Sequence, residues 1–330
     1  MRSALLEGAS WWNQAFEAAG YIDAFQVKIL PDDADPLDLR YNVIQWVHRS
    51  TRGWSYGSSV RDPRTGEIIK GHVSLGSLRI RQDFMIAQAL KAPYKSGEVS
   101  DNFALEMALA RIRQLSAHEV GHTLGFSHNF AASTVNRSSV MDYPHPWIQA
   151  SGGDLDFSQA YAVGIGDWDK VTVKYAYGEF PGDEETELRN LLDQAFEEGH
   201  RYVTDADARP AGSSNVYAHL WDNGNDIVEE LANVMEVREI GISNFSADNI
   251  RIDEPFSVLE DVFVPLYFYH RYQTEAVSKL IAGQEYGYRV RGGKQGPSKV
   301  LSEKEQQRAL ESLMATIDAK SLAIPKDKQD

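Results

Sequence analysis

One short segment of the chain places histidines at spacings that suit a metal ion. His118 and His122 are four residues apart, and His128 follows after Gly125. On a helix, side chains four apart lie on one face with Cβ atoms about 5 to 6 Å apart, so both imidazoles can point at one ion. Gly125 can adopt a positive φ, which ends the helix and lets His128 return to that ion. Three imidazoles with an open fourth position predict one catalytic zinc ion, because a structural site has four protein ligands.

Glu119 directly follows the first of these histidines. Its side chain projects about 100° around the helix axis from that of His118, so its carboxylate can reach a water molecule at the metal without binding the metal. We therefore expect Glu119 to act as a general base. The pattern HExxH arises readily by chance, whereas the longer HExxHxxGxxH is far more specific. A gluzincin, with a glutamate as the third ligand, is the alternative within zinc hydrolases, and the positions of Gly125 and His128 argue against it.

A second motif follows the histidines. The segment 138–144 has the sequence SSVMDYP, and its Met141 comes thirteen residues after His128. A tight turn that places a methionine beneath three imidazoles supplies an apolar, polarizable floor that holds the rings and keeps water away. We therefore predict a Met-turn over residues 138–144.

Together, the long histidine pattern and the Met-turn resemble the metzincins. The sequence is most similar to the "Met-zincin" catalytic domain of large bacterial zinc-dependent metalloproteases. The similarity covers most of residues 5–290, through the blocks WWNQAFEAAGY, YNVIQWVHRSTRGWSYG, DPRTGEIIKGHVSLGSLRIRQD, TDADARP, HLWDNG and PLYFYHRYQTEAVSKL. It implies an α+β zincin fold, in which a twisted mixed sheet backs an active-site helix and zinc lies at the floor of a cleft.

The resemblance also implies a role for each matching residue. His118, His122 and His128 would bind zinc, Glu119 would be the base, and Met141 would be the methionine of the Met-turn. Family members are typically longer, exported proteins with segments before this domain. We therefore expect upstream segments of a longer native protein to be missing here, and a periplasmic or extracellular location, although this chain carries no signal peptide.

Tyr143 lies two residues after Met141. In the astacins and serralysins, a tyrosine at this offset can bind zinc and swing away to hydrogen-bond the tetrahedral intermediate. A phenol beside Zn²⁺ can donate to a developing oxyanion, which makes Tyr143 a candidate catalytic residue. A tyrosine that only anchors the turn by packing is an equally good interpretation.

A candidate substrate strand precedes the histidines. We expect Gly71, His72, Val73, Ser74 and Leu75 to form the edge strand above the cleft, where unpaired backbone groups can capture an extended peptide. His72 is interpreted as a solvent-facing residue rather than a further ligand, because the three-histidine set is already complete.

The elements that position these residues follow from periodicity and turn signals. We predict a first helix over 4–19, strands over 25–30, 41–48, 54–61 and 67–75, and an active-site helix over about 102–124. The segment 62–66, DPRTG, predicts a turn that joins the last two strands into a hairpin. Downstream helices are expected over 186–196, 226–237 and 258–281, the last interrupted by Pro265, followed by a capping box at Ser302 and Glu305. These patterns predict a metzincin-like catalytic domain over 1–178 and a mainly helical C-terminal domain over 179–330.

Composition narrows the classes of partner. The 33 Lys and Arg residues against 48 Asp and Glu give a net charge of −15, so nucleic acid is not expected. The chain has no cysteine, which excludes disulfides, cysteine-bound zinc and a thiol nucleophile. The longest apolar stretch, over 262–269, is too short to span a membrane.

We therefore expect a zinc metallopeptidase, an endopeptidase acting on peptide or protein substrates. The rival from another class is a non-catalytic binding module that keeps the zinc for structure and uses its helical second half to engage a partner. Chelator-sensitive peptide cleavage distinguishes the two.

Overall fold

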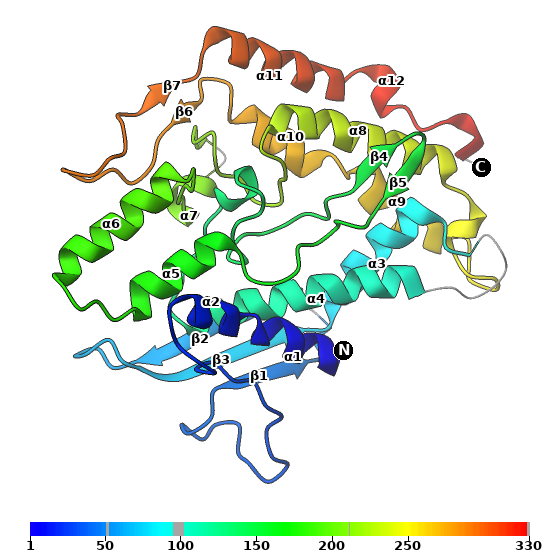
Figure 1. Cartoon of the computed structure of the whole chain (residues 1–330). Helices are drawn as coiled ribbons and strands as arrows, with labels where there is room; N and C mark the ends of the chain where they lie inside the picture. Colours follow the sequence, from blue (N-terminus) through cyan, green and yellow to red (C-terminus); the bar gives the residue numbers. More distant parts are fainter. Residues whose placement is uncertain (51–52, 95–101, 211, 329–330) are drawn as a thin grey trace.

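The computed structural model describes residues 1–50, 53–94, 102–210 and 212–328. A small mixed sheet lies on one side of the molecule, with the long helix α4 across it and further helices beyond α4 (Figure 1). Before α4 the chain forms α1 (Arg2–Ser10), α2 (Trp12–Ala18), β1 (Val43–Val47), β2 (Tyr56–Arg61), β3 (Ile68–Gly76) and α3 (Leu78–Lys91). This mixture of a small sheet and many helices is compatible with the predicted α+β class.

The three strands of this sheet are ordered β1-β3-β2. β3 pairs in parallel with β1 and antiparallel with β2, and the turn between β2 and β3 closes with a hydrogen bond from the Gly66 N–H to the Asp62 carbonyl (2.8 Å). The predicted hairpin is thus confirmed. Residues 25–30 form no strand, and the first predicted helix is two helices that meet at Trp11.

The sheet order corrects one expectation. Gly71, His72, Val73, Ser74 and Leu75 lie in β3, whose backbone groups are taken up by neighbours on both sides. The prediction that they form the edge strand is therefore wrong, because the crossover of β1 places β3 in the centre of the sheet. Among the described strands of this sheet, β1 and β2 each pair only with β3 and therefore form its two edges. Of these two edge strands, β2 is the one that packs beside α4.

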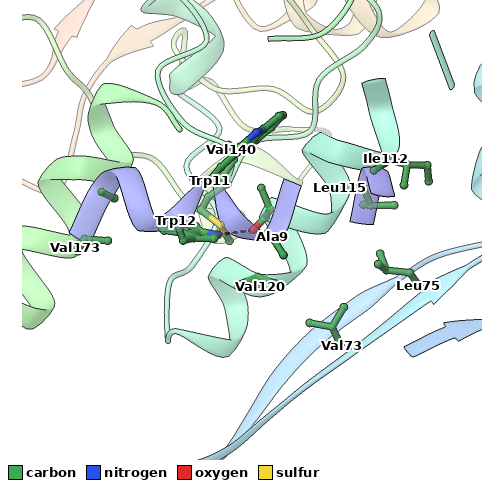
Figure 2. Packing of buried hydrophobic residues seen from close by; sticks show 14 of the residues in the cluster. Ala9, Trp11, Trp12, Val73, Leu75, Ile112, Leu115, Val120, Val140 and Val173 are labelled. Carbon is green, nitrogen blue, oxygen red and sulfur yellow. Dashed lines mark hydrogen bonds between the residues drawn. The ribbon is translucent and has the colours of Figure 1, made fainter. Parts of the chain in front are cut away.

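Helix α4 (Asn102–Thr123) is the central element of the first half and agrees with the predicted 102–124. It packs between the sheet and α1, over a buried cluster to which Trp12, Leu75 and Ile112 belong (Figure 2). The Trp12 side chain has no exposed surface, and its indole N–H donates to the Ala117 carbonyl of α4 (2.7 Å). This contact fixes the helix one residue before His118.

The described chain after α4 is mainly helical. Its elements are the short helix η1 (Ala132–Thr134), β4 (Gln149–Ser151), β5 (Asp154–Asp156), α5 (Asp167–Tyr177), α6 (Glu184–Glu197), α7 (Asp205–Ala208), α8 (Ile227–Asn244), η2 (Ala247–Asn249), α9 (Val258–Tyr267), α10 (Arg271–Ser278), β6 (Gln284–Glu285), β7 (Lys299–Val300), α11 (Glu303–Thr316), α12 (Ala319–Leu322) and η3 (Lys326–Lys328). The predicted interruption near Pro265 is present, although Pro265 lies inside α9 and the break follows Tyr267.

The C-terminal helices pack on one another and on α3. A buried cluster joins Leu90 of α3 to Val237 of α8 and Leu266 of α9. The predicted capping box is present at α11, where the Ser302 hydroxyl accepts from the Glu305 N–H (3.3 Å). Within the described residues, no helix combines the length and apolar character needed to cross a membrane.

Candidate metal centre

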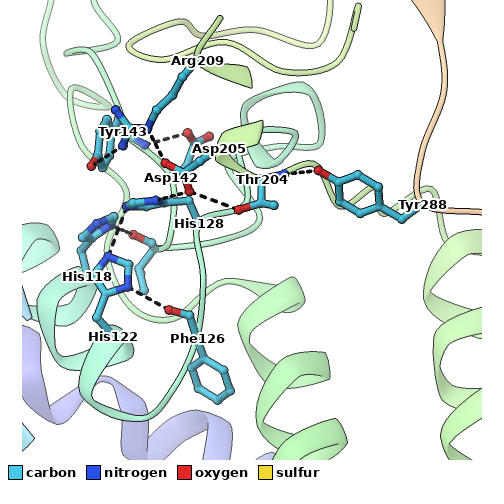
Figure 3. A network of polar contacts seen from close by, with 11 residues as sticks. His118, His122, Phe126, His128, Asp142, Tyr143, Thr204, Asp205, Arg209 and Tyr288 are labelled. Atoms are coloured by element: carbon cyan, nitrogen blue, oxygen red, sulfur yellow. Dashed lines mark hydrogen bonds and ion pairs between the residues drawn. The ribbon is translucent and has the colours of Figure 1, made fainter. Parts of the chain in front are cut away.

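The structure brings the three predicted histidine ligands together. His118 and His122 project from the last turns of α4, and the helix ends at Thr123, two residues before Gly125, whose φ of +94° lies in the left-handed region that favours glycine. The turn that follows carries His128 back toward α4. One ring nitrogen from each histidine lies within 4.8 Å of the others, so the three can contact a common ion (Figure 3).

The other nitrogen of each ring is held by an acceptor. Nδ1 of His118 donates to the Val140 carbonyl and Nδ1 of His122 to the Phe126 carbonyl, each over 2.8 Å (Figure 3). Because a carbonyl oxygen can only accept, these two Nδ1 atoms carry the proton and leave Nε2 with its lone pair. Nδ1 of His128 also has an acceptor, the Asp205 carboxylate, so the Nε2 atoms of all three rings are available to a metal.

That third acceptor is Asp205, whose Oδ2 lies 2.8 Å from Nδ1 of His128. Burial raises the pKa of Asp205, but hydrogen bonds from Arg209 and His128 outweigh burial and bring this pKa down to about 2. Asp205 is therefore an anion at neutral pH. Carboxylates in this position orient a ligating imidazole and make it a stronger base.

The surroundings keep all three imidazoles neutral, which is the form that binds a metal. Burial lowers the pKa of His118 well below its ordinary value and lowers that of His122 to about 4. Burial also lowers the pKa of His128, against the opposing hydrogen bond with Asp205. The donor set of three neutral imidazoles fits zinc.

Glu119 lies on α4 between the two helical histidines and is 5% exposed. Burial raises the pKa of the Glu119 carboxyl to about 7, while the charge of Arg111 and a hydrogen bond from the Gly57 backbone oppose the rise. Gly57 belongs to the edge strand β2. This environment suits a group that takes up and releases a proton near neutral pH.

Met141, the methionine of the predicted Met-turn, packs against α4 at Gly121. Its side chain is buried, and a Cβ added at Gly121 would stand 2.2 Å from the Met141 sulfur and 2.6 Å from the Trp12 ring. Only glycine fits at this position of α4, between Glu119 and His122, because the sulfur fills the space where a side chain would be.

Tyr143 packs directly against the histidines. Its ring centroid lies 5.4 Å from that of His118 and 4.8 Å from that of His128. The Arg209 guanidinium donates to the Tyr143 oxygen (3.0 Å), so the phenolic hydrogen remains free to donate. Burial raises the pKa of Tyr143, against the effect of Arg209, so the phenol stays protonated at neutral pH.

Asp205 and Arg209 form an ion pair within and just after α7, and sequence reasoning missed both. They join His128 to Tyr143 through a continuous chain of polar contacts (Figure 3). The available signal was the i,i+4 spacing of an Asp and an Arg within the block TDADARP, which favours a pair on one helical face.

A cleft of about 320 Å³ opens at the metal centre. His122, His128 and Asp205 line one side, and Ser59 and Arg61 of the edge strand β2 line the other. The cleft therefore exposes His122 and His128 beside a strand edge, while His118 stays buried behind them.

The remaining candidate histidine does not join the group. His72 is half-buried on the central strand β3, and its Nε2 lies 3.3 Å from the Ser74 hydroxyl. The interpretation of His72 as a residue outside the ligand set agrees with this placement, although its side chain is less solvent-exposed than expected.

The sequence was also compared with known proteins. A family model described as Met-zincin matches residues 100–329, a range that contains the histidines, the Met-turn and the helices after them. No curated protein and no solved structure matches the chain.

Proposed function

The chain belongs to the Met-zincin family of metzincin-type zinc metalloproteases, and on that premise we propose that it hydrolyses peptide bonds as an endopeptidase with one catalytic zinc ion. The zinc dependence comes with the family, and the three converging imidazoles are the observation that carries the proposal. His118, His122 and His128 would hold the ion. The zincin fold, with the sheet backing α4, is part of the same proposal.

Glu119 is the proposed general base. When bound, zinc supplies Lewis acidity, which polarises a carbonyl and makes water a better nucleophile near neutral pH. The Glu119 carboxylate would take the proton of the attacking water and then pass it to the nitrogen of the leaving amine. Its position next to His118 in the helix supports this role, and so does the hydrogen bond that Gly57 gives it.

Tyr143 is the proposed donor to the developing oxyanion. Its hydroxyl accepts from Arg209 and keeps its own hydrogen for a second partner. The same hydrogen bond supports a purely structural role, and only activity measurements on Tyr143→Phe separate the two.

The substrate would bind along the edge of β2. The cleft places Ser58 and Ser59 of β2 opposite His128, so an extended peptide added to this edge would pass over the metal centre. Backbone hydrogen bonds of that kind give affinity with little sequence selectivity.

We also propose a division of labour along the chain. Residues 1–178 hold the ligands and the reacting groups, and the mainly helical residues 179–330 complete the site through Asp205 and Arg209.

The test is a matched pair of measurements on Glu119→Gln. This variant should keep zinc, because Glu119 is not a ligand, and should cleave a casein or quenched-peptide pool about 10² to 10⁴ times more slowly. Wild-type cleavage should stop on chelation and return with added zinc. Zinc-loaded protein that cleaves no peptide in such a pool would favour the non-catalytic binding module instead.

A further inference from the structure

A cluster of cationic and aromatic side chains lies beside the metal centre, next to Tyr143. The Tyr143 ring, already in contact with His118, lies 4.9 Å from the ring of Trp221. The Arg79 guanidinium carbon is 4.9 Å from the centre of the Trp221 ring, and that of Arg111 is 5.9 Å from it. We call Arg79, Arg111 and Trp221 the Arg79–Arg111 cluster. It is two ring contacts away from a proposed zinc ligand.

The cluster holds two guanidiniums, of which one is ion-paired with a carboxylate. The buried carboxylate of Asp83 lies 3.2 Å from Nε of Arg79 and also accepts from the Tyr161 hydroxyl (2.7 Å). Arg111 is 2% exposed and makes no ion pair with any described residue. Its guanidinium donates to the neutral Gln114 side chain, and its Nε has no hydrogen-bond partner among the described residues. Two guanidiniums therefore share one ion-paired carboxylate, and the charge of Glu119, which also acts on Arg111, is lost whenever that proposed base takes up a proton.

An excess buried charge is costly unless something compensates it. A charge withdrawn from water without a partner carries a large free-energy penalty. In a chain with a net charge of −15, the excess of positive charge here runs against the average of the molecule. Arginine presents a planar fork that matches a carboxylate with two parallel hydrogen bonds. The missing counterion is thus best supplied by a carboxylate that arrives with a ligand.

Backbone strain marks the same place. Trp221 has a φ of +67°, in the left-handed region that a bulky residue rarely adopts. Its N–H donates to the Tyr143 carbonyl (2.9 Å), which holds this conformation. Such conformations cluster at ligand-binding positions, because the surrounding structure must maintain them against their cost. The strain here places an aromatic ring between the metal centre and the two arginines.

The direction of β2 relates this cluster to a bound peptide. Gly57, near the start of β2, contacts Glu119, whereas Arg61 at its end lines the cleft with His128. A peptide paired antiparallel with β2, the slightly more stable arrangement, therefore runs from Arg61 toward Gly57. Its residues after the scissile bond continue toward the side of Arg111.

Only a few residues of a bound peptide are needed to span the distance from the metal centre to Arg111. Arg111 precedes His118 by seven residues of α4, or about 10 Å along the helix axis. An extended peptide advances about 3.4 Å per residue, so the first three residues after the scissile bond cover this distance.

We propose that the Arg79–Arg111 cluster is a substrate subsite for a carboxylate carried by one of the first three residues after the scissile bond. The proposal rests on the peptidase function above and goes beyond it by assigning a specificity. The carboxylate has two possible sources, an acidic side chain or the free C-terminus of a short substrate.

The first experiment uses the zinc-loaded full chain and quenched peptides that differ by one group. Glu and Gln are compared at the first, second and third position after the scissile bond, each with an amidated C-terminus. A further pair compares a free C-terminus with an amide on the neutral peptide. Glu over Gln, or acid over amide, should raise kcat/KM at least about tenfold at one position. Equal values throughout, with cleavage intact, would overturn the subsite and leave the peptidase function standing.

The second experiment assigns the effect to the cluster. Arg79→Gln should reduce the preference for the carboxylate peptide to less than about threefold. The matched control is Arg81→Gln, because Arg81 also lies on α3 but pairs with Asp261 away from the cluster. An unchanged preference in folded Arg79→Gln would contradict the proposal, and the wild-type comparison decides without any variant if Arg79→Gln fails to fold.

A binding measurement separates failure of the subsite from failure of the peptidase function. Zinc-loaded Glu119→Gln is titrated with the Glu and Gln peptides, and affinity is measured by calorimetry. Tighter binding of the carboxylate peptide supports the subsite even if no peptide is cleaved. Equal binding, like equal cleavage, would overturn it.

Discussion

The two halves of the chain contribute to the metal centre in different ways. Residues 1–178 supply all three imidazoles and Glu119, within eleven consecutive residues at the end of one helix and the turn after it. Residues 179–330 supply none of the proposed ligands, yet Asp205 holds His128 and Arg209 holds Tyr143. On the proposed function, one half would carry the reacting groups, and the other would hold two of them in place.

The difference shows how positioning groups are distributed. His118 and His122 are oriented by backbone carbonyls of their own half, at Val140 and Phe126. His128 lies after the helix ends, where the local backbone offers it no such acceptor, and its partner comes from 77 residues downstream. The ligand outside the helix is therefore the one that depends on the second half.

The strongest way to test the comparison is to remove a ligand from the first half. His122→Ala should abolish stoichiometric zinc binding and all hydrolysis, because two imidazoles hold the ion too weakly. Metal content after dialysis measures this directly. His72→Ala is the matched control on the neighbouring strand β3 and should keep zinc; loss of zinc in both variants would mean that the ligand set is not the proposed one.

The second test removes the partner from the second half. Asp205→Ala should weaken zinc binding about 10- to 100-fold, because the His128 ring loses the acceptor that orients it. Competition with a zinc chelator of known affinity gives the value. Asp207→Ala, two residues along the chain in α7, should leave zinc affinity unchanged, since the Asp207 carboxylate accepts from Tyr286 and Tyr288. Similar losses in both variants would point to general damage to α7.

A third test asks whether Arg209 acts through Tyr143. Tyr143→Phe should lower kcat about 10- to 100-fold by removing a donor to the oxyanion. Arg209→Met should lower kcat roughly tenfold. The double variant should have a kcat no lower than that of Tyr143→Phe alone, because the two groups act as one unit. Additive losses would separate Arg209 from Tyr143 and leave it only its ion pair with Asp205.

The smallest effect is expected far from the metal, in the helices of the second half. Asp226 caps α8 and pairs with Arg308 of α11. Burial raises the pKa of Asp226, but the hydrogen bond from Arg308 and the backbone N–H groups at the start of α8 outweigh burial and lower this pKa. The unfolded state, with the ordinary pKa near 3.9, therefore binds the proton more tightly, so this stabilisation is present above about pH 4 and is lost as the pH falls through the lowered value.

Asp226→Asn keeps an N-cap and removes the charge. It should cost less than about 1 kcal/mol of unfolding free energy at pH 7, since solvent screens the pair, and it should lose less stability than wild type between pH 5 and pH 3. Denaturant unfolding at both pH values measures this, with zinc affinity unchanged. A drop in zinc affinity would show that the helical region acts on the site more widely than through Asp205 and Arg209.

Some elements followed from local pattern because local forces decide them. The hairpin turn at 62–66, the capping box at Ser302 and the end of α4 before Gly125 each depend on residues within a few positions of one another. Residues 25–30 have a strand-like composition, but Phe25 and Val27 pack on the core without strand pairing, because a strand also needs a partner that only the fold provides.

The sequence by itself determined that the three proposed ligands converge, because a helix places residues four apart on one face whatever surrounds it, and a glycine that permits a positive φ lets the chain turn back within three residues. Only the tertiary structure decided which strand offers an edge, since strand order depends on a crossover rather than on composition. It also decided that Asp205, Arg209 and Trp221 join the centre. Their contacts span dozens of residues, and no local spacing encodes a contact that the packing of distant segments creates.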